Sequence, residues 1–177
     1  MRKMIETILV ALDGSERSDQ ALSLAGDMAL KYNARVILLH TLLHSASIGD
    51  LEDIAERYGF SEQIKKDIDD IDVVPVLMDV IGSERALLYV PVEVLRIVGK
   101  LYVEKAASHL AEKGLSNVKT YVVGGQPAPE ILYYAQNEDA DLIVMGTRGL
   151  GDVKSLVLGS VSHKVLQQSK CPCLLTK

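Results

Sequence analysis

The amino-acid sequence predicts an α/β fold, in which an open, five-stranded parallel sheet of order 3-2-1-4-5 carries helices on both faces. Two observations lead to this Rossmann-like arrangement. Short apolar runs rich in branched residues alternate along the chain with amphipathic stretches, and the joints between them contain turn or capping residues. Nearly half of the residues (48%) are apolar but only 5% are aromatic, so the 177 residues can form one domain, 1–177, with an aliphatic core.

The first half of the chain reads as strand, helix, strand. Residues 3–12 form a short apolar run that suits a strand buried on both faces. Ser15 is placed to cap a helix with an apolar stripe, and Asn33 closes that helix. Residues 34–43 form a second buried strand. Such short joints imply a parallel pair with a right-handed crossover.

The second half repeats this alternation. Gly114 ends one predicted helix, Pro129 suits the first turn of the next, and Pro172 suits the start of an edge strand. The elements expected here, in order, are a helix at 94–113, a strand at 117–123, a helix from 126, a strand at 139–146, a helix at 158–169 and a strand at 171–176.

The segment 45–92 interrupts the alternation and is interpreted as a helical insertion after the second strand. Its first part resembles a polar amphipathic helix or helix pair, and its second part is apolar but broken by prolines and a glycine. Neither part has a phosphate-binding motif. We therefore expect the insertion to be separable from ligand binding, so that a short linker in place of about 46–91 leaves affinity unchanged.

Composition excludes some classes of partner. A balance of 19 basic and 24 acidic residues argues against a nucleic-acid surface. No apolar run approaches the length of a membrane span, and the start of the chain lacks a secretory cleavage pattern, so a cytoplasmic protein is expected. Cys171 and Cys173 are interpreted as small buried side chains in preference to a metal site or a disulfide.

Glycines gather where two strands of the predicted sheet end. With the order 3-2-1-4-5, the reversal lies between strands one and four, which brings the sequences ALDGS and MGTRG to one crevice. Gly146, Gly149, Gly151 and Gly159 would either adopt positive φ or let a ligand approach the main chain.

Two interpretations of this glycine cluster stay open on the residues alone. One is a phosphate cradle in which the start of a helix at Gly159 favours an anion, Ser160 and Ser162 add hydroxyl donors, and Arg148 or Lys154 adds positive charge. The other is a loop that only turns the chain. The P-loop and dinucleotide-binding patterns are both missing.

The run GTRGLGDVKSLVLGS has the spacing Gly, two residues, Gly, nine residues, Gly-Ser. It resembles the ATP-binding signature of the universal stress protein family, and VALDGS resembles the end of that family's first strand. The resemblance covers about residues 1–44 and 94–177. It favours the phosphate cradle over a simple turn.

The resemblance implies a bound ATP, ADP or AMP with Mg²⁺. Asp13 would lie near the ribose or a phosphate-bound metal, Thr41 would meet adenine through its backbone, and Ala11 would line the pocket. The alternatives are an Asx-turn or helix cap for Asp13 and plain strand packing for Thr41. The nucleotide-binding residues implied in this way are Ala11, Asp13, Thr41, Met145, Gly146, Arg148, Gly149, Gly159, Ser160, Val161 and Ser162, with Asp13 also as the metal ligand.

The function expected from these observations is adenine-nucleotide binding by a stress-response or regulatory protein without dedicated catalysis. The C-terminal strand, as an edge strand, would join two copies into a homodimer. Two alternatives remain, a slow ATP-hydrolysing enzyme and a protein-interaction module that binds no nucleotide. His40 and His44 are expected to be structural, and His163 to lie on a solvated helix face.

Overall fold

A five-stranded parallel sheet of order β3-β2-β1-β4-β5 forms the centre of the fold, as predicted. The computed structural model describes residues 5–42, 48–59, 61–62, 92–150 and 158–177, with 48–52 described as backbone only. The expectations for residues 3–4, His44, the later part of the insertion, Gly151 and Lys154 lie outside the described residues. The strands are β1 (Thr7–Leu12), β2 (Arg35–Thr41), β3 (Val118–Val123), β4 (Leu142–Gly146) and β5 (Cys173–Thr176).

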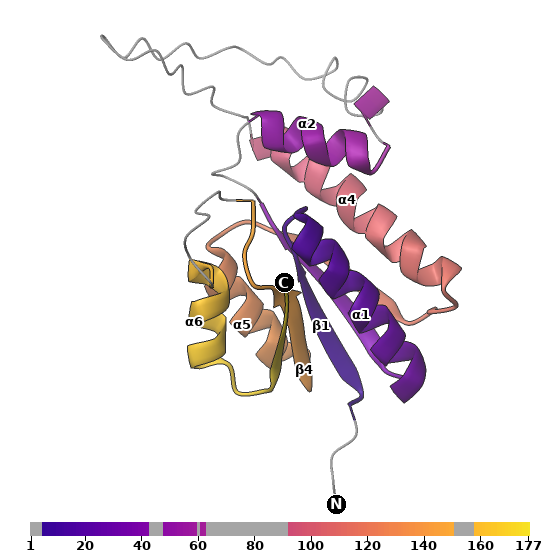
Figure 1. Ribbon diagram of the computed structural model, residues 1–177, viewed down its shortest axis with the longest axis vertical. Coiled ribbons are helices and arrows are strands. Elements are labelled where there is room, and N and C mark those ends of the chain that lie inside the picture. The colour runs from indigo at the N-terminus through magenta and orange to yellow at the C-terminus, as the bar shows by residue number, and fades with distance from the viewer. Residues whose placement is uncertain (1–4, 43–47, 60, 63–91, 151–157) are drawn as a thin grey trace, which may run out of the picture.

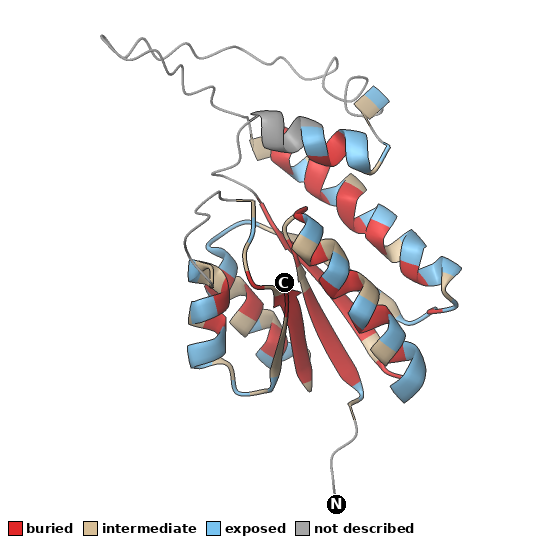
Figure 2. Ribbon diagram, in the orientation of Figure 1, coloured by how far each residue is buried: buried red, intermediate tan, exposed pale blue. Residues whose placement is uncertain are grey.

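Helices cover both faces of this sheet (Figure 1). One buried cluster joins one face of the strands to α1 (Glu16–Tyr32), α2 (Ile48–Arg57) and α4 (Val92–Glu112). A second cluster joins the opposite face to α5 (Pro127–Asn137) and α6 (Ser160–Gln168). Figure 2 shows buried residues along the strands and on the helix sides that face them. The strands β1, β2 and β4 are buried on both faces, which explains their nearly continuous apolar sequences.

Local signals fix several element ends as the sequence predicts. Ser15 caps α1, accepting a hydrogen bond from the Ser18 amide at 3.2 Å. Asn33 ends α1 in the left-handed region, at φ 52°. All five strands start later than their predicted bounds. Before β4, Asp139 adopts a φ of 50°, and Pro172 precedes β5.

Part of the insertion belongs to the core. α2 lies within the segment 45–92 and packs against α4, with Ile54 fully buried and Ala55 nearly so. Figure 1 shows α2 lying beside the first part of α4. The helical part of the prediction for this segment is therefore confirmed for α2.

His40 on β2 is buried between the sheet and α4. Its Nδ1 donates to the Leu12 carbonyl oxygen at 3.0 Å, since a carbonyl can only accept, and its ring contacts Tyr102 edge-on at 5.6 Å. A Cβ on Gly99 would lie 2.8 Å from His40 Cδ2, so α4 approaches the imidazole closely only because residue 99 is glycine. Burial lowers the pKa of His40, more than the Leu12 carbonyl and the Asp13 charge raise it. The expected structural role of His40 agrees with these contacts.

We expect the fold to lose stability as the pH falls below about 6.5, the ordinary pKa of histidine. The unfolded chain then binds a proton that His40 in the folded chain resists, so the free energy of unfolding decreases by up to about 1.4 kcal/mol per pH unit. Denaturant unfolding at pH 7.5 and 5.5 measures this loss. His40→Gln should show a smaller loss, with His163→Gln on α6 as the control for removing an exposed imidazole; equal losses in all three proteins would contradict the assignment.

Candidate functional site

The loops after β1 and β4 lie side by side at the carboxyl end of the sheet, where the strand order reverses. Val10 pairs with Val144, so both strands end at the same level. A Cβ on Gly149 would overlap the Asp13 carboxylate, and one on Gly146 would lie 2.8 Å from Arg17 Cβ at the start of α1. Two loops more than a hundred residues apart therefore form the single crevice that the strand order predicts.

The two oxygens of the Asp13 carboxylate have different surroundings. Oδ1 accepts hydrogen bonds from the Ser15 amide at 3.0 Å and the Ser15 hydroxyl at 2.7 Å, which is an Asx-turn. Oδ2 is the oxygen that faces Gly149. Oδ1 thus forms the Asx-turn that is the alternative to ligand binding, while Oδ2 points across the crevice toward the loop after β4.

The backbone of the first loop is held by side chains from several elements. The Leu12 carbonyl accepts from His40 on β2, and the Ser15 carbonyl accepts from the Ser18 hydroxyl at 2.8 Å. Gly14 has a φ of 84°, a conformation that favours glycine. This loop is therefore fixed before any ligand arrives.

The glycines of the crevice serve close approach, and not an unusual backbone conformation. Gly146, Gly149 and Gly159 all lack positive φ, which corrects one of the two reasons that the sequence offers for them. Space is the reason instead, because Gly146 is pressed against α1 and Gly149 against Asp13. At Gly159, a Cβ would meet the Thr147 carbonyl oxygen at 3.3 Å, a tight but less severe contact.

α6 begins at this crevice, with Gly159 as its N-cap residue. The Gly159 amide donates to the Thr147 carbonyl at 2.8 Å, and the Ser162 hydroxyl donates to the same oxygen at 2.7 Å. Both groups thus hold the loop together, whereas the sequence suggests them as ligand donors. The amides of Ser160, Val161 and Ser162 form the first turn, where N–H groups have no intrahelical partner. The Ser160 side chain is exposed.

Ala11, Thr41 and Met145 share the sheet face that α5 and α6 cover, because all three alternate with residues of the opposite face. Ala11 and Met145 belong to the apolar cluster on that face. Thr41 is 6% exposed and ends β2 beside Val123, so the strand-packing alternative describes its side chain. Arg148 is half-buried in the loop after β4. The structure thus gathers the described candidate residues at one end of the sheet.

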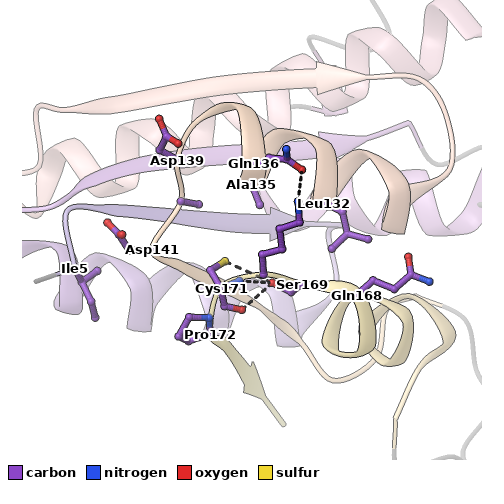
Figure 3. A pocket seen from close by; sticks show the side chains of 12 residues that line it. Ile5, Leu132, Ala135, Gln136, Asp139, Asp141, Gln168, Ser169, Cys171 and Pro172 are labelled. Atoms are coloured by element: carbon purple, nitrogen blue, oxygen red, sulfur yellow. Dashed lines mark hydrogen bonds between the residues drawn. The ribbon is translucent and has the colours of Figure 1, made fainter. Parts of the chain in front are cut away.

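The amino-terminal end of the sheet holds a separate cavity of about 500 Å³, shown in Figure 3. Lys170 Nζ donates to the Gln136 side-chain oxygen at 3.4 Å. Cys171 and Asp141 are among the residues that line the cavity. Cys171 and Cys173 are free thiols, half-buried beside the α5–α6 cluster. Because this cavity lies where β1 and β4 begin, it is distinct from the crevice at their ends.

Several residues that shape the crevice cannot be recognised from the sequence pattern. Thr147 offers the carbonyl that holds the start of α6, Arg17 packs on Gly146, and Arg57 on α2 donates to the Gly14 carbonyl at 2.6 Å. A backbone carbonyl has no sequence signal, and the partner of Arg57 lies 43 positions away. Within the described residues, no group of three or more His, Cys, Asp or Glu could hold a metal ion unaided. The same residues contain no helix both long and apolar enough to cross a bilayer.

Comparison with known proteins places the chain in a family. The model of the universal stress protein family matches residues 4–177, a range that includes the segment 45–92. Universal stress protein YxiE of Bacillus subtilis (strain 168) is 33% identical over 178 residues, covering 98% of this chain and 100% of that protein. The chain therefore belongs to the universal stress protein family.

Solved structures agree on the fold. Protein MJ0577, from Methanocaldococcus jannaschii, superposes with a TM-score of 0.65 at 24% identity, covering 99% of this chain and 97% of that one. A universal stress protein from Archaeoglobus fulgidus in complex with dAMP gives a TM-score of 0.59 at 18% identity, covering 99% of this chain and 100% of that one. Two further structural neighbours are universal stress proteins with bound cAMP and AMP.

Proposed function

We propose that this protein binds an adenine nucleotide in the crevice between the loops after β1 and β4. The observation that carries the proposal is the position of Asp13 Oδ2 against Gly149, beside the first turn of α6, whose amides have no intrahelical partner. An exposed glycine there leaves the main chain open to a phosphate, and the helix start favours negative charge. Structural neighbours bound to cAMP, dAMP and AMP support an adenine nucleotide as the ligand class.

Each part of the nucleotide has proposed contacts. The amides of Ser160, Val161 and Ser162 hold phosphate oxygens, with Gly149 and Gly159 giving access and Arg148 adding positive charge. Adenine and ribose lie toward the sheet face that carries Ala11, Thr41 and Met145. There Thr41 offers its backbone, and Gly146 keeps the crevice open.

Asp13 fits a magnesium ion that bridges to phosphates. Magnesium is commonly held by one or two carboxylates together with phosphate oxygens and waters, so a single carboxylate suffices. Such an ion also offsets the repulsion between Asp13 and a phosphate chain. We propose ATP with magnesium as the resident ligand, in a stress-response or regulatory protein that has no dedicated catalysis.

Mass spectrometry of small molecules released from the denatured protein, together with calorimetric titration of ATP, ADP and AMP, tests this function. We expect an adenine nucleotide in the released fraction and tightest binding for ATP with magnesium. A protein that releases no nucleotide and binds none of the three would favour the interaction-module alternative. Rapid metal-dependent ATP turnover would favour the enzyme.

We further propose that two copies pair through β5. This strand lies at one edge of the sheet, next to β4 only. Cys173 is the register partner of Ile143, whose amide donates to the Pro172 carbonyl at 3.0 Å. In a parallel ladder the residues flanking Cys173 therefore bond to β4, and the amide and carbonyl of Cys173 itself point away from the sheet. A strand of a second copy can bond there.

Cys173→Pro should convert the dimer to a monomer, because proline lacks the outward N–H group. Cys173→Ala, which keeps that group, should remain a dimer and is the matched control. Light scattering at micromolar concentration measures the mass. A monomeric wild type, or a dimeric proline variant, would show that β5 does not form the interface.

A further inference from the structure

The end of helix α2 is attached to the loop that presents Asp13. Arg57 Nη1 donates to the Gly14 carbonyl at 2.6 Å and lies 3.4 Å from Asp19 Oδ2 on α1. Ile54 fills the space above Gly14, where a Cβ would lie 2.5 Å from Ile54 Cδ1. Gly14 is the residue between the Asp13 carboxylate and Ser15, which binds it, so α2 restrains the turn that orients this carboxylate.

A second set of contacts joins the same helix end to α1 and α4. Tyr58, which follows α2, donates to Asp19 Oδ1 and packs edge-on against Tyr102 at 4.7 Å. Tyr102 OH lies 3.0 Å from the Ser18 hydroxyl, which itself donates to the Ser15 carbonyl at 2.8 Å. Tyr102 OH also lies 3.5 Å from Asp19 Oδ1, so this buried phenol joins α4 to α1 and, through Ser18, to the Asp13–Ser15 loop.

These tyrosines act as neutral hydrogen-bonding groups and not as acids or bases. Burial raises the pKa of Tyr102 and of Tyr58 far above the ordinary value, so both phenols keep their protons. The network therefore joins α2 and α4 to α1 and, through Ser18, to the first loop.

We propose that Arg57 is a positioning residue for the nucleotide site and that docking of α2 is coupled to nucleotide binding through Gly14. This inference rests on the proposed function, since it concerns the same crevice. A ligand that bridges to Asp13 favours the turn that Arg57 holds, and by linkage it favours the docked position of α2. The prediction from sequence that the segment 45–92 is separable is thereby revised, because replacing 46–91 would remove Arg57 and Ile54.

Calorimetric titration of ATP, with magnesium and with EDTA, into wild type, Arg57→Ala, Arg57→Lys and Arg96→Ala tests the coupling. Arg96 is an exposed residue of α4 and controls for the loss of one positive charge. We expect Arg57→Ala to weaken binding about tenfold with magnesium, equivalent to about 1.4 kcal/mol, and much less in EDTA. Arg57→Lys should recover part of the loss, and Arg96→Ala should match wild type.

Hydrogen exchange of the wild-type protein gives an independent measurement that needs no variant. The amides of residues 54–58 should exchange at least about fivefold more slowly with ATP and magnesium than without, because a coupling of 1 to 3 kcal/mol changes an equilibrium by about 5- to 150-fold. This result decides the question if Arg57→Ala does not fold.

The outcomes separate the two proposals. A wild type that binds no adenine nucleotide overturns the proposed function. If wild type binds but exchange at 54–58 is unchanged, or Arg57→Ala binds like Arg96→Ala, the function stands and the coupling is wrong. An equal loss with and without magnesium would give Arg57 only a structural role, which also overturns the inference.

Discussion

Gly149→Val is expected to weaken ATP binding by about a hundredfold or more. The new Cβ would overlap the Asp13 carboxylate, so the loops after β1 and β4 must separate or the carboxylate must turn away. After either movement, the phosphates lose their contacts with the loop and with magnesium. Losing two hydrogen bonds to charged oxygens, at about 1.5 to 3 kcal/mol each, corresponds to at least a hundredfold in affinity.

The other crevice variants should have graded effects. Gly159→Val places its Cβ in tight contact with the Thr147 carbonyl without overlapping a charged group, so a smaller loss is expected. Ser160→Ala should lose least, because the backbone donors survive. Calorimetry of ATP with magnesium gives the order, and circular dichroism confirms that each variant is folded.

Gly114→Val is the matched control because it makes the same substitution far from the crevice. There it strains the backbone but does not block access of the ligand. Gly114 follows α4 at the opposite end of the sheet and has a φ of 95°, which a β-branched residue resists at a cost of about 1 to 3 kcal/mol. It should lower the free energy of unfolding and leave the affinity of the folded protein unchanged. If Gly149→Val is folded and binds as tightly as wild type, the glycines of this crevice serve only the packing of the chain.

Much of the fold follows from local signals in the sequence. Ser15 and Asn33 determine where α1 begins and ends, and the apolar runs of β1, β2 and β4 indicate strands covered on both sides. The strand order then places Asp13 opposite Gly149 without any knowledge of side-chain contacts. Parallel topology is what makes the crevice predictable, since it brings the ends of distant strands to one edge.

Other features depend on tertiary contacts that leave no sequence pattern. A glycine can be needed for positive φ or for space, and the sequence cannot distinguish Gly14, which has positive φ, from Gly149, which does not. The amphipathic pattern of α2 predicts a buried side but not the residues packed against that side, so it does not indicate the contact of Ile54 with Gly14. The Ser162 hydroxyl, which the sequence suggests as a ligand donor, is a third example, because its acceptor is a backbone carbonyl.

Asp13→Asn should reverse the effect of magnesium on ATP binding. The asparagine side-chain oxygen can still accept the hydrogen bonds of Ser15 that Oδ1 accepts, so the Asx-turn is retained. The charge at the position facing Gly149 is lost. We expect ATP with magnesium to bind about 10- to 100-fold more weakly, as for the loss of one charge-assisted contact of about 1.5 to 3 kcal/mol.

In EDTA the same variant should bind ATP as tightly as wild type or more tightly, because the carboxylate no longer repels the phosphates. Asp139→Asn removes an exposed carboxylate at the other end of the sheet, at a left-handed position that asparagine tolerates, and should leave both titrations unchanged. A general weakening of the loop would lower affinity in both buffers, whereas loss of a metal contact lowers it only with magnesium. If Asp13→Asn lowers ATP affinity with magnesium but not in EDTA, the Asp13 charge acts through the cation. If affinity falls equally in both buffers, Asp13 serves only to form the turn.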